Sequence, residues 1–232
     1  YPMKKICIII AGIVILLMVT PFAMAQKETW DGLGTLLKGA RAGLPLEKFL
    51  KNHPDAKNAG ATLREKPVDP KASTANLEEQ YNRDPFLGLW AFASYGFKEG
   101  TLRELAVLWH DEASKTNSLK DTFFKACIRK HGAAFRRDAI KIDPETDKEH
   151  WAPMLVWTTQ EAVFLASYST QQDEKKGPRG SFTYAMLPVG DAFLEAQLEG
   201  KTLSADELEE VYKEIEPLLA KAVKKSGKQK KK

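Results

Sequence analysis

Large apolar residues recur along much of the chain at spacings of three and four, which place them on one face of a helix. Near the N-terminal end, residues 29–38 and 46–51 have this pattern, and the second stretch follows Pro45, a residue that suits the first turn of a helix. Residues 53–75 contain few large apolar side chains. The pattern therefore predicts a helical N-terminal segment followed by a long exposed loop or linker.

The central part of the chain predicts three successive helices. Residues 84–97 open with Asp-Pro, which is typical of a helix start, and continue as an apolar run. Residues 101–104 form a capping box, which predicts a second helix through Trp109. Residues 118–131 are predicted to form the third helix, closed by a histidine in its last turn and a glycine just beyond it.

The segment 150–190 fits two interpretations. One is a helix through residues 162–168, preceded by a capping sequence. The other is a β-hairpin that pairs residues 163–169 with residues 181–187 across a charged loop. In the second of these runs large side chains alternate with small ones, which is typical of a strand and favours the hairpin.

A last helix has clear signals at both ends. Ser204 and Glu207 form a capping box, and an apolar stripe follows over residues 208–219. Pro217 lies within the stripe, which predicts a kink or the end of a first half. Acidic residues lie near its start and lysines near its end, as the helix dipole favours.

These elements predict a mainly α fold, an all-alpha helical domain with a possible β-hairpin around residues 162–187. The predicted parts are a signal peptide (1–25), an N-terminal helical segment and linker (26–75), a main helical domain (76–223) and a disordered basic tail (224–232).

The first 25 residues have the charged, apolar, small-residue order of a secretory signal peptide. Lys4 and Lys5 precede an apolar run over residues 6–19, and small residues lie at the positions that a signal peptidase recognises before Ala25. We therefore expect cleavage after Ala25 and a periplasmic or secreted protein of a bacterial envelope. The alternative is an anchor in the inner membrane formed by residues 6–25.

Charge is distributed unevenly along the chain. Between residues 26 and 220, 26 basic residues face 31 acidic ones, whereas residues 221–232 contain seven lysines and no acidic residue. A nucleic-acid-binding domain carries its positive charge on a folded face, so this distribution argues against nucleic acid as a partner. After residue 25 the only cysteine is Cys127, whose apolar context predicts an inert buried thiol.

No sequence motif indicates catalysis, a cofactor or a metal. His110, Asp111 and Glu112 are the closest approach to a reactive group, and a solvated helix edge is the simpler interpretation. Enzymatic activity is therefore the less favoured expectation. The alternative is an envelope hydrolase that uses two carboxylates without a local motif, for example Glu149 and Glu161, because glycoside hydrolysis needs only two acidic groups about 5–10 Å apart.

The aromatic residues supply one binding hypothesis, a cleft for a sugar ring or an apolar ligand. Packing in the core of the domain is the competing interpretation of the same residues. The candidate binding residues are Trp90, Tyr95, Trp109, Trp151 and Trp157.

The basic tail supplies a second hypothesis, reversible attachment to an anionic membrane surface or another acidic partner. A purely solubilising role is the alternative. The candidate residues of the tail are Lys224, Lys225, Lys228, Lys230, Lys231 and Lys232. We therefore expect an exported, non-catalytic accessory or adaptor protein that binds an envelope protein partner, with the envelope hydrolase and a soluble carrier with an aromatic pocket as alternatives.

Overall fold

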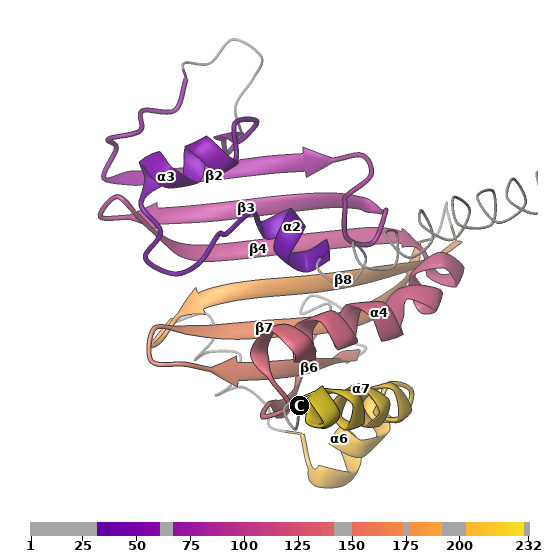
Figure 1. The fold of residues 1–232 in the computed structure, drawn as a ribbon. Coiled ribbons are helices and arrows are strands. Elements are labelled where there is room, and N and C mark those ends of the chain that lie inside the picture. Colours follow the sequence, from indigo (N-terminus) through magenta and orange to yellow (C-terminus); the bar gives the residue numbers. More distant parts are fainter. Residues whose placement is uncertain (1–31, 61–66, 142–149, 174–176, 192–202, 230–232) are drawn as a thin grey trace, which may run out of the picture.

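The computed structural model of the chain describes residues 32–60, 67–141, 150–173, 177–191 and 203–229. The predicted signal peptide, residues 1–25, lies outside the described residues. An eight-stranded antiparallel sheet forms the centre of the structure, with the strand order β1-β2-β3-β4-β8-β7-β6-β5 (Figure 1). The prediction of a mainly α, all-alpha fold is therefore wrong.

The helices pack against this sheet. Figure 1 shows α2, α3 and α4 over one face of the sheet, with α6 and α7 beside its β6 end. The strands are β1 (Lys57–Asn58), β2 (Thr74–Tyr81), β3 (Trp90–Lys98), β4 (Thr101–Glu112), β5 (Arg136–Lys141), β6 (Trp151–Thr158), β7 (Ala162–Asp173) and β8 (Gly177–Pro188). The described helices are α2 (Gly32–Leu37), α3 (Leu46–Asn52), α4 (Ala113–His131), α6 (Ala205–Tyr212) and α7 (Glu216–Gln229).

A short turn and strand β3 occupy the place of the predicted helix 84–97. The Asp84 carboxylate does act as a cap, because it accepts three backbone hydrogen bonds of 2.8–2.9 Å. The turn ends at Gly88, whose φ of +68° is incompatible with a continuing right-handed helix. The donors to Asp84 are the N–H groups of Phe86, Leu87 and Leu89.

Strand β3 has large apolar side chains on both faces. Tyr95 and Phe97 are buried beneath the helices, whereas Trp90 and Phe92 point to the opposite face and are half-buried. A strand that is apolar on both faces lacks the alternation of a one-sided strand, so its pattern cannot be distinguished from that of a buried helix.

A β-bulge explains why the helix predicted for residues 101–109 is wrong. In β4 the pairing with β3 shifts by one residue, which leaves Arg103 as the extra residue. Leu102 and Leu105 therefore both face the core at a spacing of three, although both lie in a strand. Leu108 lies on the opposite face and is 38% exposed. The apolar residues whose spacing predicts one face of a helix therefore lie on two faces of a strand.

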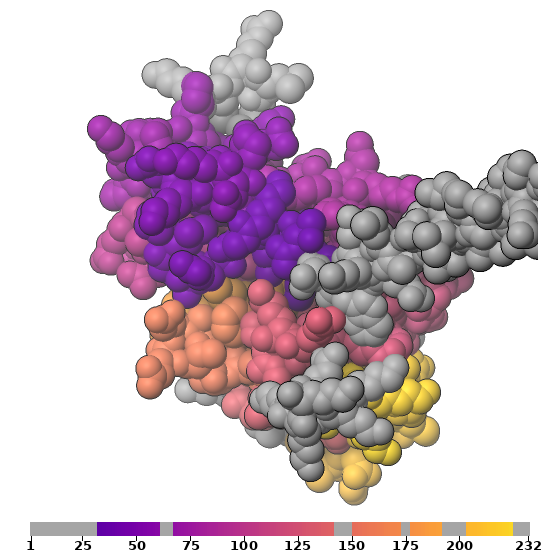
Figure 2. Space-filling view, viewed as in Figure 1, coloured from indigo at the N-terminus to yellow at the C-terminus, as the bar shows by residue number. Residues whose placement is uncertain are grey.

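The N-terminal segment shares one core with the sheet. Leu36 of α2 and Phe49 of α3 are fully buried in the same cluster as Leu77 of β2. The backbones of Leu44 and Leu102 are also hydrogen-bonded, and Figure 2 shows the indigo segment packed directly on the magenta strands. Within the described residues, α2 and α3 thus contribute to the same hydrophobic core as the sheet.

The hairpin predicted around residues 162–187 is confirmed as β7 and β8, with longer strands than expected. Strand β6, next to β7, is apolar on both faces, as β3 is, and Leu155 and Trp157 belong to the main core. Met154 and Val156 belong to a second cluster with residues of β7 and β8. Alternation along the strand places this second cluster on the other face of the sheet.

The remaining helices follow the sequence signals closely. Helix α4 ends at His131 as predicted and begins at Ala113, five residues before the expected start. The capping box at Ser204 is confirmed, and the last helix divides into α6 and α7 near Pro217. Helix α7 continues to Gln229, into the part of the chain predicted as a disordered tail. Within the described ranges, no helix is both long and apolar enough to cross a membrane.

Candidate ligand-binding cavity

A cavity of about 590 Å³ lies between the adjoining ends of β6 and β7 and the connection from α6 to α7. Its volume is within the range of roughly 300–1,000 Å³ that is typical of small-molecule sites. The apolar part of its lining consists of Trp151, Ala152, Pro153, Tyr168, Val211 and Ile215. The polar part consists of His150, Ser169, Thr170, Glu210, Lys213 and Glu214.

Strand alternation provides the floor of the cavity. Trp151 and Pro153 of β6 lie on the helix-covered face, and so does Tyr168 of β7. Trp151 is half-buried, whereas Tyr168 is 4% exposed. The Tyr168 hydroxyl donates a 2.8 Å hydrogen bond to Asn117 Oδ1 of α4, which fixes the orientation of the ring. Burial raises the pKa of Tyr168, so the ring stays neutral at physiological pH.

Tyr212 attaches α6, which lines one side of the cavity, to the sheet. Its hydroxyl lies 2.7 Å from the carbonyl oxygen of Met154 and 2.9 Å from that of Asp138, and it accepts a hydrogen bond from the Asp138 N–H. Tyr212 is 2% exposed. This contact satisfies backbone groups of β5 and β6 and holds the carboxyl end of α6 beside the sheet, where the lining residues Glu210 and Glu214 lie.

Ion pairs neutralise the carboxylates of the cavity lining. Glu210 pairs with Lys213 at 3.1 Å. Glu214 accepts a 3.0 Å hydrogen bond from Lys120 of α4, whose ammonium also lies 4.4 Å from the centre of the Tyr168 ring. The Lys120 side chain is only 10% exposed, so Glu214 and the aromatic ring replace much of its hydration. The described lining therefore has little uncompensated charge.

The structure does not bring the five predicted aromatic residues together. Trp151 lines the cavity, but Trp157 lies in the core with its indole N–H donating to the carbonyl oxygen of Gly132. Trp109 is fully buried against Phe86 and Phe123. The Trp90 ring lies against the His110 ring, tilted by 46°, on the opposite face of the sheet from Trp109.

Most residues of the cavity lining were not predicted as site residues from the sequence. Tyr168 and Glu214 lie in segments with strand and helix patterns that carry no binding motif. His150 donates from Nε2 to the carbonyl oxygen of Thr170. Only the pairing of β6 with β7 and the position of α6 reveal that these segments meet.

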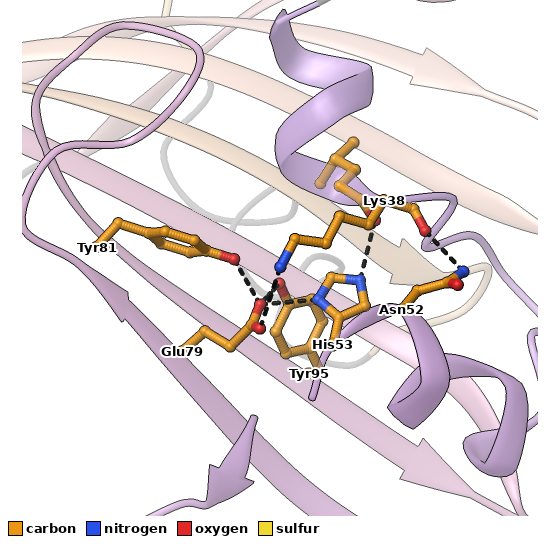
Figure 3. A network of polar contacts seen from close by, with 7 residues as sticks. Lys38, Asn52, His53, Glu79, Tyr81 and Tyr95 are labelled. Carbon is orange, nitrogen blue, oxygen red and sulfur yellow. Dashed lines mark hydrogen bonds and ion pairs between the residues drawn. The ribbon is translucent and has the colours of Figure 1, made fainter. Parts of the chain in front are cut away.

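The fifth predicted aromatic residue, Tyr95, belongs to a buried polar cluster at the other end of the sheet (Figure 3). The hydroxyls of Tyr81 and Tyr95 and Nδ1 of His53 all donate to Oε2 of Glu79, at 2.6, 2.9 and 2.8 Å. Lys38 adds an ion pair at 3.7 Å to the other carboxylate oxygen. Burial raises the pKa of Glu79, but these donors and the charge of His53 outweigh it and hold that pKa at about 2.

Each ring nitrogen of His53 has a buried hydrogen-bond partner. Its Nδ1 faces the Glu79 carboxylate, and its Nε2 lies 3.2 Å from the carbonyl oxygen of Leu37. Both ring nitrogens of His53 therefore face an oxygen that can accept a hydrogen bond. The cluster thus links the ends of α2 and α3 to β2, and with His53 and Glu79 almost fully buried it is a structural link.

The remaining predicted groups lie apart from the cavity. His110, Asp111 and Glu112 end strand β4, so their expected place on a helix edge is wrong. Glu161 lies in the turn after β6, whose eight residues span roughly 26 Å. Its proposed partner Glu149 precedes the other end of that strand and lies outside the described residues, so this pairing stays a prediction.

Cys127 is buried as predicted, and burial raises the pKa of its thiol. In the described ranges no group of three or more His, Cys, Asp or Glu residues is arranged to hold a metal ion. Of the tail lysines, Lys224 is exposed on α7, and the backbone of Lys225 and Lys228 is helical. Residues 230–232 lie outside the described residues.

We expect the protein to lose stability in acid because of His131. Its Nε2 lies 2.9 Å from the Tyr184 hydroxyl, within hydrogen-bond distance, and burial together with nearby Lys130 lowers its pKa from 6.5 to about 4. Below pH 6.5 the unfolded chain binds a proton that the folded chain does not, so stability falls until about pH 4. Because the ring is partly solvated, we expect a loss of about 2 kcal/mol.

This prediction is checked by urea unfolding between pH 7 and pH 4, with His131→Gln as the comparison. The glutamine can keep a hydrogen bond to Tyr184 but does not titrate, so its unfolding free energy should depend less steeply on pH. Equal pH dependence in the two proteins would contradict the assignment of a neutral buried imidazole.

Comparison of the chain with protein-family models, with curated proteins and with solved structures gives no match.

Proposed function

We propose that the protein is an exported, non-catalytic carrier that holds a small ligand in the cavity between α6 and the ends of β6 and β7. The observation that supports this proposal most strongly is the composition of the cavity. An aromatic and aliphatic floor lies beneath a limited set of polar groups, which is the usual make-up of small-molecule sites.

The same cavity favours the carrier over the hydrolase. Glycoside hydrolysis uses one carboxyl group as an acid and a second as a base or nucleophile, whereas Glu210 and Glu214 of the cavity are each paired with a lysine. Docking on an envelope complex stays a prediction, as does attachment of the tail to a membrane. Export rests on the N-terminal sequence pattern alone and is part of the proposal.

Blocking the cavity should prevent the ligand from co-purifying with the protein. Val211 projects from α6 into the cavity lining and is half-buried, so the larger side chain of Val211→Trp would occupy part of the volume. Mass spectrometry of small molecules released from the protein, purified from the envelope, should find about tenfold less ligand per chain in this variant.

The matched control is Leu108→Trp, which adds the same indole on the opposite face of the sheet. It should retain the ligand at the wild-type level. Thermal unfolding of both variants shows whether either has lost its fold. A wild-type protein that releases no small molecule, or equal amounts from Val211→Trp and the wild type, would count against the carrier.

A further inference from the structure

We infer that the ligand is a neutral, polyhydroxylated ring of the saccharide class, an inference that rests on the carrier proposed above. The chemistry that points to this class is a flat apolar floor next to a rim whose charges are already paired.

The floor suits a ring with one apolar face. Trp151 is half-buried in the lining, and Pro153 lies two residues further along the same face of β6. A saccharide ring presents C–H groups on its face and hydroxyls around its edge. Its face can therefore cover the indole and the proline, while its edge stays within reach of polar groups.

The rim argues against a charged ligand. Glu210 is paired with Lys213 of the rim, and Glu214 is paired with Lys120 of α4, so each carboxylate of the described rim has a basic partner. A charged ligand would be attracted to one member of each pair and repelled by the other, so the pairs favour neither a cation nor an anion. Hydroxyls, in contrast, both donate and accept, and can bond to the carboxylates and to the lysines without breaking either pair.

The rim also argues against a purely apolar ligand. The polar groups of His150, Thr170 and Glu210 border the cavity, and a hydrocarbon chain would separate them from water without replacing their hydrogen bonds. A ligand with hydroxyls on its edge avoids this cost. The polar groups of the rim therefore favour a neutral ligand that can form hydrogen bonds with them.

The inference is tested by calorimetric titration of the protein, purified as the cell exports it, with three probe classes. The neutral probes are cellobiose, maltose and N,N′-diacetylchitobiose, the cationic probe is spermidine and the apolar probe is laurate. We expect at least one disaccharide to bind, with an affinity that changes less than about twofold between low and high salt.

Variants then locate the bound probe. Trp151→Ala should weaken disaccharide binding by about tenfold. Trp151→Phe, which keeps a flat apolar ring, should retain most of it and guards against a fold defect in the alanine variant. Trp90→Ala removes an equally large, half-buried indole on the far face and should leave the affinity unchanged.

Each outcome separates the two proposals. Binding of spermidine or laurate that depends on Trp151, without disaccharide binding, overturns the saccharide class and leaves the carrier in place. Disaccharide binding that is unaffected by Trp151→Ala overturns the assignment of this class to this cavity. If no probe binds, the saccharide inference is overturned, and the mass spectrometry of released ligand decides the fate of the carrier.

Discussion

Replacing Glu79 with alanine is expected to lower the free energy of unfolding by about 3–5 kcal/mol, because the side chains of His53, Tyr81 and Tyr95 lose the acceptor that they share. His53 is fully buried, and its Nδ1 donates to Glu79. The hydroxyls of Tyr81 and Tyr95 lose the same acceptor. No other described residue is bonded to His53 Nδ1, so the lost interactions cannot be replaced without opening the contact between α3 and β2.

The neighbouring residue supplies the control for this prediction. Glu78 lies on the same strand but points to the other face and is only half-buried, so Glu78→Ala should change stability by no more than about 0.5 kcal/mol. Urea unfolding at pH 7 compares the two. Similar small effects of both substitutions would show that the cluster is not the link between the N-terminal helices and the sheet.

Replacing Gly180 with alanine is expected to cost about 3 kcal/mol, since there is no room for a methyl group between β8 and α4. A Cβ atom at this position would lie 1.8 Å from Oγ1 and 2.8 Å from Cβ of Thr116. It would also lie 2.9 Å from the Tyr168 hydroxyl. Thr116 is fully buried, so neither side chain can move aside without displacing α4 from the sheet.

The same substitution in a glycine with free space is the control. A Cβ at Gly34 of α2 would meet nothing within 4 Å, so Gly34→Ala should leave the protein equally stable or stabilise it by up to about 1 kcal/mol. Thermal and urea unfolding measure both variants. A Gly180→Ala protein as stable as the wild type would mean that α4 lies further from β8 than described.

The sequence predicts the ends of helices better than it predicts the sheet. The capping box at Ser204 and the close of α4 at His131 depend on local contacts, and both are confirmed. The hairpin of β7 and β8 is visible because its second strand alternates large and small residues. Strands β3 and β6 are apolar on both faces, so nothing local distinguishes them from buried helices.

Two further features of the β3–β4 hairpin imitate helical signals. The bulge at Arg103 changes the spacing of core residues from two to three. The turn is a two-residue loop, Glu99-Gly100, with positive φ angles of 55° and 69°, which is typical of a tight hairpin. Asn or Asp before the glycine is the usual sequence signal of such a turn, so Glu99-Gly100 does not indicate a hairpin from the sequence alone.

Of the candidate site, only Trp151 could be predicted as a binding residue. The cavity is formed by residues 150–153, 168–170 and 210–215, which are far apart in the sequence and contain no shared motif. Their meeting depends on the pairing of β6 with β7 and on the anchoring of α6 by Tyr212. Aromatic composition suggests a cleft, but strand alternation distributes Trp90 and Trp109 to opposite faces.

The indole N–H signals in the NMR spectrum of the ¹⁵N-labelled protein test the central claim most directly. They are assigned with single Trp→Phe variants and followed while a small-molecule extract of the cell envelope is added. The carrier predicts a saturable shift of the Trp151 signal, with the signals of Trp90 and Trp109 unmoved. A Trp151 signal that does not respond, or a shift confined to Trp90, would contradict ligand binding in the cavity beside α6.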